Sequence, residues 1–285
     1  MIVFAAIAPH GDMDLDEPLR EAMEELGRRF DAAEAETAIV VTPHNVHVEG
    51  HFAVITSAKI GALECDRALS AAVIDALRVA GLPVVGASYG GNDATQAEMP
   101  LDWGTEVPIG FLRAKRVVIV SPARDRPLEE HVRAGAALRA LPGRLALVAS
   151  ADHGHAHDAH GPYGFDPAAA EYDALVQQIV RDGPLRFEPL ATIVEPAKAD
   201  SLWQLLVLQG AAGGAHVPTC SPMPRRPTTG CSSRPSSRRS ANGRHKWYIP
   251  IKWLIQHRQW RTSRSPFRLP TTRRSTCSSC ASRTS

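Results

Sequence analysis

Acidic residues are missing from the end of this 285-residue chain, because no aspartate or glutamate follows Asp200. Residues 1–213 hold 17 basic and 30 acidic residues, whereas residues 214–285 hold 15 basic residues and no acidic one. The formal net charge of +2 therefore hides two stretches of opposite charge. The last stretch is also rich in Ser, Arg, Thr and Pro, a composition that does not build a hydrophobic core. We expect a domain boundary at about residue 213, with an irregular basic tail beyond it.

The origin of this tail is open to more than one interpretation. A complete lack of acids, combined with a bias to Ser, Arg, Pro, Thr and Cys, is typical of GC-rich coding DNA translated in a shifted frame, and we favour that interpretation. A basic arm that binds nucleic acid is the competing hypothesis. Regularly interleaved aromatic residues, as in single-strand binders, are missing, so nucleic acid is not the expected partner. Cys277 and Cys280 form a lone CxxC, which is weak evidence for a zinc site.

Long apolar runs and paired cysteines are also absent. No run of about 18 apolar residues occurs, so we expect no membrane span. The first residues lack the basic segment of a signal peptide, so we expect none. Only Cys65 lies within residues 1–213, which excludes a disulfide framework there and makes a reducing cytoplasm the expected location.

Apolar runs of strand length alternate with amphipathic runs of helix length over residues 1–210. This alternation predicts an α/β fold, with a central mixed or parallel sheet flanked by helices. Asp14 or Asp16 is the expected cap of the first helix, and Asp200 or Ser201 that of the last. The expected strands are 2–8, 38–42, 52–56, 84–88, 117–120 and 145–149. The expected helices are 16–30, 67–80, 128–141, 167–181 and 201–209.

Histidine-rich loops follow three of the expected strands. Strand 2–8 leads to His10, strand 38–42 leads to His44, and strand 145–149 leads into the segment 150–160, which holds four histidines. The carboxyl ends of strands in an open α/β sheet carry its ligand sites, so we expect the active site there. Imidazole is a common ligand of Fe(II) and Zn(II), and a histidine outside the metal's ligand set can act as an acid or base.

Five blocks of sequence resemble, in order, the class III extradiol ring-cleavage dioxygenases. This LigB-like superfamily also includes the Memo-like proteins. The resemblance covers about residues 1–211 and supports a catalytic domain over 1–213. The matching blocks are 8–11, 40–44 together with 50–54, 100–109, 150–155 and 200–204.

The resemblance implies a site and a reaction. His10 and His44 correspond to the two metal-binding histidines, with Fe(II) as cofactor, and His155 corresponds to the acid/base; His153 fits that role less well. The implied substrates are a catechol-type diol and dioxygen, and the ring opens beside the hydroxyls. His51, Tyr163 and Trp103 are candidate substrate-binding residues. The plainer alternatives are that His51 is a solvated loop histidine and that Tyr163 is a packed tyrosine. Relatives suggest a homo-oligomer.

Two departures from the family pattern stand out. Trp103 follows Asp102 where many ring-cleaving members have histidine, so one acid/base group is absent. The family's third ligand is a glutamate near the C-terminus, and here no acid follows Asp200. The missing carboxylate predicts impaired ring cleavage. The alternative is a Memo-like protein that binds a metal, zinc included, or another ligand without dioxygenase activity.

Overall fold

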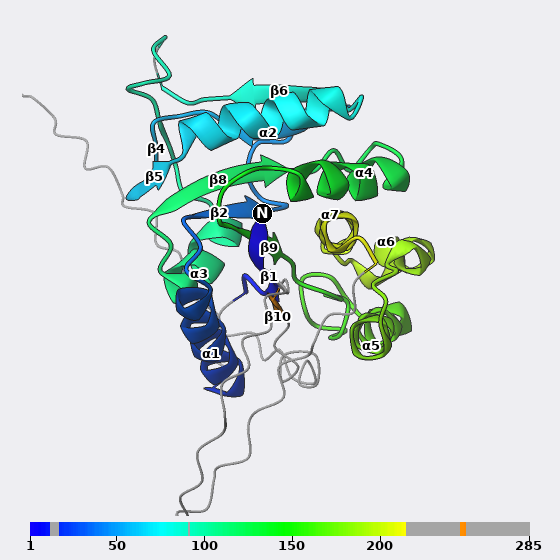
Figure 1. The fold of residues 1–285 in the computed structure, drawn as a ribbon. Helices are drawn as coiled ribbons and strands as arrows, with labels where there is room; N and C mark the ends of the chain where they lie inside the picture. The colour runs from blue at the N-terminus through cyan, green and yellow to red at the C-terminus, as the bar shows by residue number, and fades with distance from the viewer. Residues whose placement is uncertain (12–16, 91, 215–245, 249–285) are drawn as a thin grey trace, which may run out of the picture.

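A computed structural model describes residues 1–11, 17–90, 92–214 and 246–248 (Figure 1). Within these ranges the chain forms a ten-stranded, mixed but mostly parallel sheet with helices on its faces. The predicted α/β class is therefore confirmed. None of the helices in the described ranges has the length and apolar content needed to cross a membrane.

All six predicted strands are present, and four short strands appear that the sequence pattern does not indicate. All of these six except the strand at residues 84–87 are buried along almost their whole length, which explains their continuous apolar runs. The predicted strands are β1 Ile2–Ala8, β2 Thr37–Val41, β3 Phe52–Ile55, β6 Val84–Ala87, β8 Arg116–Ser121 and β9 Leu145–Ser150. The additional strands are β4 Lys59–Ile60, β5 Leu63–Cys65, β7 Glu98–Met99 and β10 Lys246–Tyr248.

The sheet places the ends of β1, β9 and β2 side by side. Its strand order begins β10-β1-β9-β2-β8, and all these neighbours are parallel. Ala8 pairs with Ser150, and Val41 pairs with Ala149, so the three strands end at one level. The loops after them therefore leave the sheet at one edge. Beyond β8 the order becomes mixed, because β3 pairs with β8 antiparallel.

The predicted tail lies mostly outside the described residues. The structure describes three of its residues beyond Gly214, and these form β10, parallel to the edge strand β1. The expectation of an irregular tail does not hold for this short segment. The proposed caps Asp14 and Asp16 also lie outside the described residues.

All five predicted helices are present, with ends shifted by a few residues. Figure 1 shows α1 and α3 grouped on one side of β1, and α4 to α7 grouped on the other. The helices not predicted are α3, which carries Pro108 inside, and two short ones. The predicted helices are α1 Glu17–Ala33, α2 Arg67–Val79, α4 Leu128–Arg139, α5 Pro167–Asp182 and α7 Leu202–Ala212. The others are α3 Trp103–Leu112, the 3-10 helix η2 Glu188–Thr192 and α6 Val194–Ala197.

Helix α7 is buried along its whole length and packs directly on the backbone of α4. A Cβ on Gly210 would lie 1.8 Å from the Val132 carbonyl oxygen, and one on Gly135 would lie 1.9 Å from that of Val207. Only glycine allows so close an approach of two helix backbones. This glycine contact sets how deeply α7 sits in the fold.

We expect Gly210→Ala to lower the free energy of unfolding by about 1–3 kcal/mol, because the added methyl group forces two packed helices apart. Urea denaturation measures the change. Gly110→Ala is the control: Gly110 is an exposed residue of α3, and a Cβ there would meet open space. That substitution should leave the stability unchanged or raise it by up to about 1 kcal/mol. Equal stability of Gly210→Ala and wild type would contradict the close contact.

Candidate metal centre and active site

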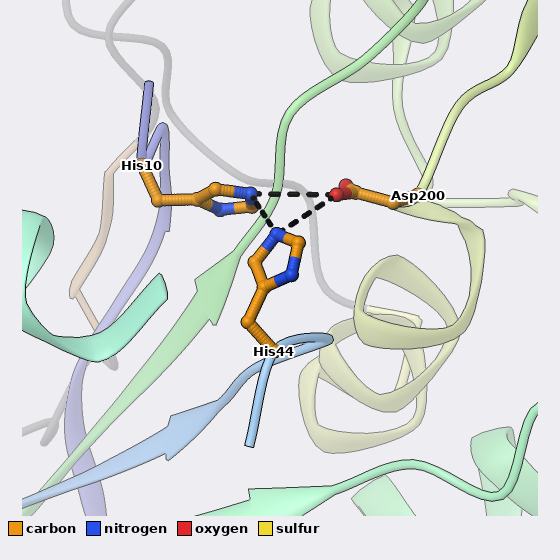
Figure 2. Close-up of side chains that lie close together, drawn as sticks. All are labelled: His10, His44 and Asp200. Carbon is orange, nitrogen blue, oxygen red and sulfur yellow. Dashed lines mark hydrogen bonds and ion pairs between the residues drawn. The ribbon is translucent and has the colours of Figure 1, made fainter. Parts of the chain in front are cut away.

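Three side chains from distant parts of the chain converge on one point (Figure 2). The Nε2 atoms of His10 and His44 are 2.9 Å apart. The Oδ2 atom of Asp200 lies 3.4 Å from the first nitrogen and 3.3 Å from the second. His10 is buried, whereas His44 and Asp200 are partly accessible.

Each of these side chains is positioned by the element beside it. His10 follows β1, and its backbone N–H donates to Asp152 Oδ1 at 3.0 Å. His44 follows β2, and its backbone N–H donates to Thr42 Oγ1 at 3.3 Å. Asp200 lies two residues before the start of α7, so the burial of that helix determines where its carboxylate lies.

A serine at the end of β9 determines the tautomer of His10. The hydroxyl of Ser150 donates its single proton to the carbonyl oxygen of Gly104. Its oxygen also lies 3.0 Å from His10 Nδ1 and must accept a proton there. Neutral His10 therefore carries its proton on Nδ1 and directs the lone pair of Nε2 toward His44 and Asp200.

The start of α3 shapes the space around His44. Asp102 caps this helix, accepting from the Thr105 N–H, and also accepts from Thr42 Oγ1 and Asn45 Nδ2. A Cβ on Gly104 would lie 2.4 Å from Thr42 Oγ1 and 3.1 Å from His44 Cδ2. The missing side chain at position 104 thus lets α3 approach the His44 loop.

The carboxylate of Asp200 and the imidazoles of His10 and His44 influence each other's ionisation. Burial opposes ionisation of Asp200, but hydrogen bonds from His10 and His44 outweigh it and hold the pKa of this carboxyl well below its usual range. Burial alone would lower the pKa of His10, but the carboxylates of Asp152 and Asp200 more than offset it, so the pKa is raised. Asp200 is therefore a carboxylate at neutral pH, ready to neutralise a cation.

The donor set fits a divalent metal ion. Two ligand atoms that each lie about 2.1 Å from one ion at a right angle are about 3 Å apart, close to the three separations seen here. The second carboxylate oxygen of Asp200 is buried and has no hydrogen-bond partner among the described residues. Two imidazoles and one carboxylate are the facial ligand set of non-haem Fe(II), and zinc accepts the same donors.

A cavity of about 750 Å³ opens over this cluster. The aromatic residues Trp103, Tyr163 and Trp203 line it, together with His155. The Nδ1 atom of His155 lies 2.7 Å from the carbonyl oxygen of Lys198 and must donate to it. Neutral His155 therefore keeps its Nε2 lone pair available as a base.

The other predicted histidines lie outside the cavity lining. His153 is buried, and its Nδ1 bonds Ser201 Oγ at 3.0 Å. His51 bonds the carbonyl oxygen of Glu49 through Nδ1 and does not reach the cavity, so its substrate-binding role finds no support in the geometry. Of the three candidate substrate-binding residues, the structure brings Tyr163 and Trp103 to the cavity.

Asp173 on α5 holds the loop that carries His155. Its Oδ1 accepts the Gly154 N–H at 2.9 Å, and its Oδ2 lies 3.0 Å from His157 Nε2. A Cβ on Gly154 would lie 2.7 Å from the carbonyl oxygen of Ala169, so the loop lies directly against α5. The loop is therefore tied to a rigid helix on both sides of His155.

The sequence reasoning missed Asp200 as a candidate ligand. It was offered, beside Ser201, as a cap of the last helix, and the chain was taken to lack a third ligand. Of the two proposed caps, Ser201 occupies the cap position of α7, with no side-chain cap bond, and the carboxylate of Asp200 faces the histidines. The only signal in the sequence was its position as the last acid, two residues before a mostly apolar helix without charged residues.

The chain is similar to known proteins in family and in fold. A family model described as the catalytic LigB subunit of aromatic ring-opening dioxygenase matches residues 2–226. The crystal structure of an uncharacterized protein from Escherichia coli K12 has a TM-score of 0.51 and 19% sequence identity, covering 72% of this chain and 88% of that chain. At this identity the likeness concerns the fold alone. No curated protein matches the chain.

We expect Ser150→Ala to weaken Fe(II) or Zn(II) binding by about 10–100-fold, because His10 loses the partner that fixes its tautomer. Anaerobic calorimetric titration of the full chain measures the affinity. Ser121→Ala is the matched control, since Ser121 ends β8 as Ser150 ends β9, and its hydroxyl has no hydrogen-bond partner among the described residues. An equal loss of affinity in both variants would contradict this role of Ser150.

The Asp173–His157 pair gives a pH-dependent contribution to stability. The hydrogen bond that His157 donates to the Asp173 carboxylate raises the pKa of His157 above 6.5. Burial works against the Asp173 carboxylate, but His157 and the Gly154 N–H lower its pKa below 3.8. The contribution is therefore complete between these two values and is lost as the pH rises through the raised pKa of His157.

We accordingly expect Asp173→Asn to destabilise the protein more at about pH 5.5 than at about pH 9. Urea denaturation at both values measures the difference. In a His157→Gln background the effect of Asp173→Asn should no longer depend on pH over this range. A wild-type advantage that is the same at both values would show that the pair does not form.

Proposed function

The chain belongs to the LigB family of aromatic ring-opening dioxygenases, and we propose that it cleaves a catechol-type diol with dioxygen, using Fe(II) held by His10, His44 and Asp200. The observation that carries the proposal is the convergence of two imidazole nitrogens and one carboxylate oxygen at the edge of the cavity. The family sets the reaction type, and these three donors set where the metal would lie. The iron, the substrate and the role of each residue are proposals.

When bound, the iron supplies the redox chemistry between diol and dioxygen and acts as a Lewis acid. The chain's own residues do the rest. Trp103 and Tyr163 offer aromatic surfaces to a substrate ring. His155 holds its Nε2 ready to take a phenolic proton and to return it to the product, because Lys198 fixes its tautomer.

Asp200 changes the expectation of impaired activity. That expectation rested on the missing C-terminal glutamate, whereas the proposed site takes its carboxylate from Asp200, two residues before α7. We therefore propose that the chain retains a complete set of three ligands. Trp103 still stands where many members have a histidine, and it packs against the His44 ring at 4.4 Å between centroids.

The domain, the cellular location and the assembly of the protein can be proposed as well. We propose that residues 1–213 form the catalytic domain, that it takes part in aromatic compound catabolism in the cytoplasm, and that it forms a homo-oligomer. Reducing conditions would keep the single described cysteine, Cys65, as a thiol and the iron ferrous. The frame-shift and nucleic-acid hypotheses concern residues outside the described ranges and stay predictions.

We expect Asp200→Asn to weaken Fe(II) binding by at least about 100-fold and to abolish ring cleavage, since even residues behind the ligands typically contribute about 10–100-fold. Anaerobic titration measures the affinity, and the absorbance of the ring-opened product of catechol measures turnover. Asp182→Asn, an exposed position at the end of α5, is the control and should match wild type. Wild-type affinity in Asp200→Asn would refute the ligand assignment.

The same assay separates the dioxygenase from the Memo-like alternative. Iron-loaded wild type that binds catechol and turns it over in air supports ring cleavage. Tight metal binding without turnover of any catechol supports the alternative, which Trp103 in place of histidine favours. Trp103→His then tests whether a second acid/base group restores turnover.

A further inference from the structure

Three buried polar side chains form a hydrogen-bonded group beside the candidate metal cluster. Tyr172 lies on α5, Ser201 directly before α7, and His153 in the loop after β9, and all three are buried. The Ser201 hydroxyl oxygen lies 3.0 Å from the Tyr172 hydroxyl and 3.0 Å from His153 Nδ1. None of the three lines the cavity, so none of them can contact a substrate there. The proposed reaction therefore gives no role to this group, which we call the Ser201 network.

Ser201 occupies the cap position of α7 but does not cap the helix. A serine at this position usually accepts a hydrogen bond from a backbone N–H of the first turn. Ser201 makes no such side-chain bond. A hydroxyl can donate one proton and still accept another, so it can bond Tyr172 and His153 at the same time. The serine therefore links the start of α7 to α5 and to the loop after β9.

The bonds of Ser201 restrain the turn that presents the Asp200 carboxylate. Ser201 is the one residue between Asp200 and the first residue of α7. A rotation of the backbone there would move the carboxylate away from His10 and His44, whose Nε2 atoms lie 3.4 and 3.3 Å from it. Hydrogen bonds depend on direction as well as distance, so two of them on the Ser201 side chain oppose such a rotation.

Tyr172 can hold Ser201 at any physiological pH. Burial raises the pKa of the Tyr172 hydroxyl, and the carboxylates of Asp200 and Asp173 raise it further, so the group stays neutral and keeps its proton. Asp173, the next residue of α5, accepts the Gly154 N–H at 2.9 Å. Two consecutive residues of one helix thus hold the segment that carries the carboxylate and the loop that carries the proposed acid/base histidine.

Stability alone does not account for polar side chains at these buried positions. A buried hydrogen bond adds little net free energy, and replacing both of its partners by apolar groups of the same shape can be nearly neutral. Bonded polar groups in a core do, however, make its arrangement more rigid and more specific. The Ser201 network therefore fits a role in position better than a role in stability.

We propose that Ser201 is a positioning residue that acts through Asp200. Its bonds to Tyr172 and His153 hold the Asp200 carboxylate toward the two histidines of the cluster, whether or not an ion is bound. The inference rests on the proposed function for the metal. The orientation of the carboxylate can be measured in the metal-free chain, so a failure of this inference is distinguishable from a failure of the proposed iron site.

The first measurement detects the carboxylate without a metal. The imidazole ¹⁵N resonances of His10 and His44 are recorded by NMR in the metal-free full chain at one fixed pH. Asp200→Asn removes the charge beside both Nε2 atoms, and its shifts set the scale. Ser201→Ala should shift the same resonances in the same direction. Tyr172→Phe should shift them less, because one of the two bonds of Ser201 remains.

Val176→Ala is the matched control. Val176 is buried on α5, one turn after Tyr172, and lies outside the Ser201 network. The substitution leaves a cavity and destabilises the same helix, but it should leave the imidazole resonances unchanged. Circular dichroism checks that each variant is folded. Tyr172→Phe, which removes a single oxygen atom, carries the test if Ser201→Ala does not fold.

The second measurement is a double-mutant cycle of metal affinity. Anaerobic titration of the full chain with Fe(II) should show a loss of about 10-fold in Ser201→Ala, the lower end of the range for residues behind a ligand. In an Asp200→Asn background the same substitution should change the affinity by less than about 2-fold, because the group through which Ser201 acts is gone. Val176→Ala should bind Fe(II) as wild type does.

Four outcomes would overturn the inference. They are unchanged imidazole resonances in both Ser201→Ala and Tyr172→Phe, equal shifts in Val176→Ala, wild-type Fe(II) affinity in Ser201→Ala, and a loss from Ser201→Ala that is as large in the Asp200→Asn background as in wild type. Resonances that shift as expected in a chain that binds no Fe(II) would support the positioning role and count against the proposed iron site alone.

Discussion

The backbone contact between α4 and α7 is the constraint on which the candidate site depends. Gly135 and Gly210 let the two helices approach until carbonyl oxygens face the space where side chains would otherwise be. Asp200 stands two residues before the start of the buried helix, and Trp203 lies within its first turn. The depth to which α7 is buried thus decides whether a carboxylate meets the two histidines and whether the Trp203 ring lines the cavity.

The sheet positions the other residues of the candidate site, independently of α7. Three adjacent parallel strands end at one level, and their ends and the loops after them place His10, His44 and Ser150 at the same edge. The Ser150 hydroxyl then joins β9, the His10 ring and the start of α3 through one proton donated and one accepted. Local hydrogen bonds orient each candidate ligand, whereas the packing of whole elements brings the three side chains together.

The sequence predicts the parts of this arrangement that leave a local pattern. Buried strands show as apolar runs and amphipathic helices as a regular spacing, so the six long strands and five helices were found. Helix α3 was not predicted because Pro108 and an apolar composition hide its periodicity. Strands β4, β5 and β7 were not predicted because they are too short to show an alternating pattern. His10 and His44 follow strands and could be proposed as ligands. Asp200 could not, because nothing local relates a residue before α7 to loops more than 150 positions earlier.

The full burial of α7 also couples metal binding at the candidate site to folding. A helix without a polar face gains little by forming alone, so the third donor reaches its place only when the helix docks, and the complete donor set exists only in the native state. A metal ion at 100 times its dissociation constant would then add about 2.7 kcal/mol to the free energy of unfolding. If the proposed site holds a metal in the cell, the lifetime of this protein would follow the supply of that metal.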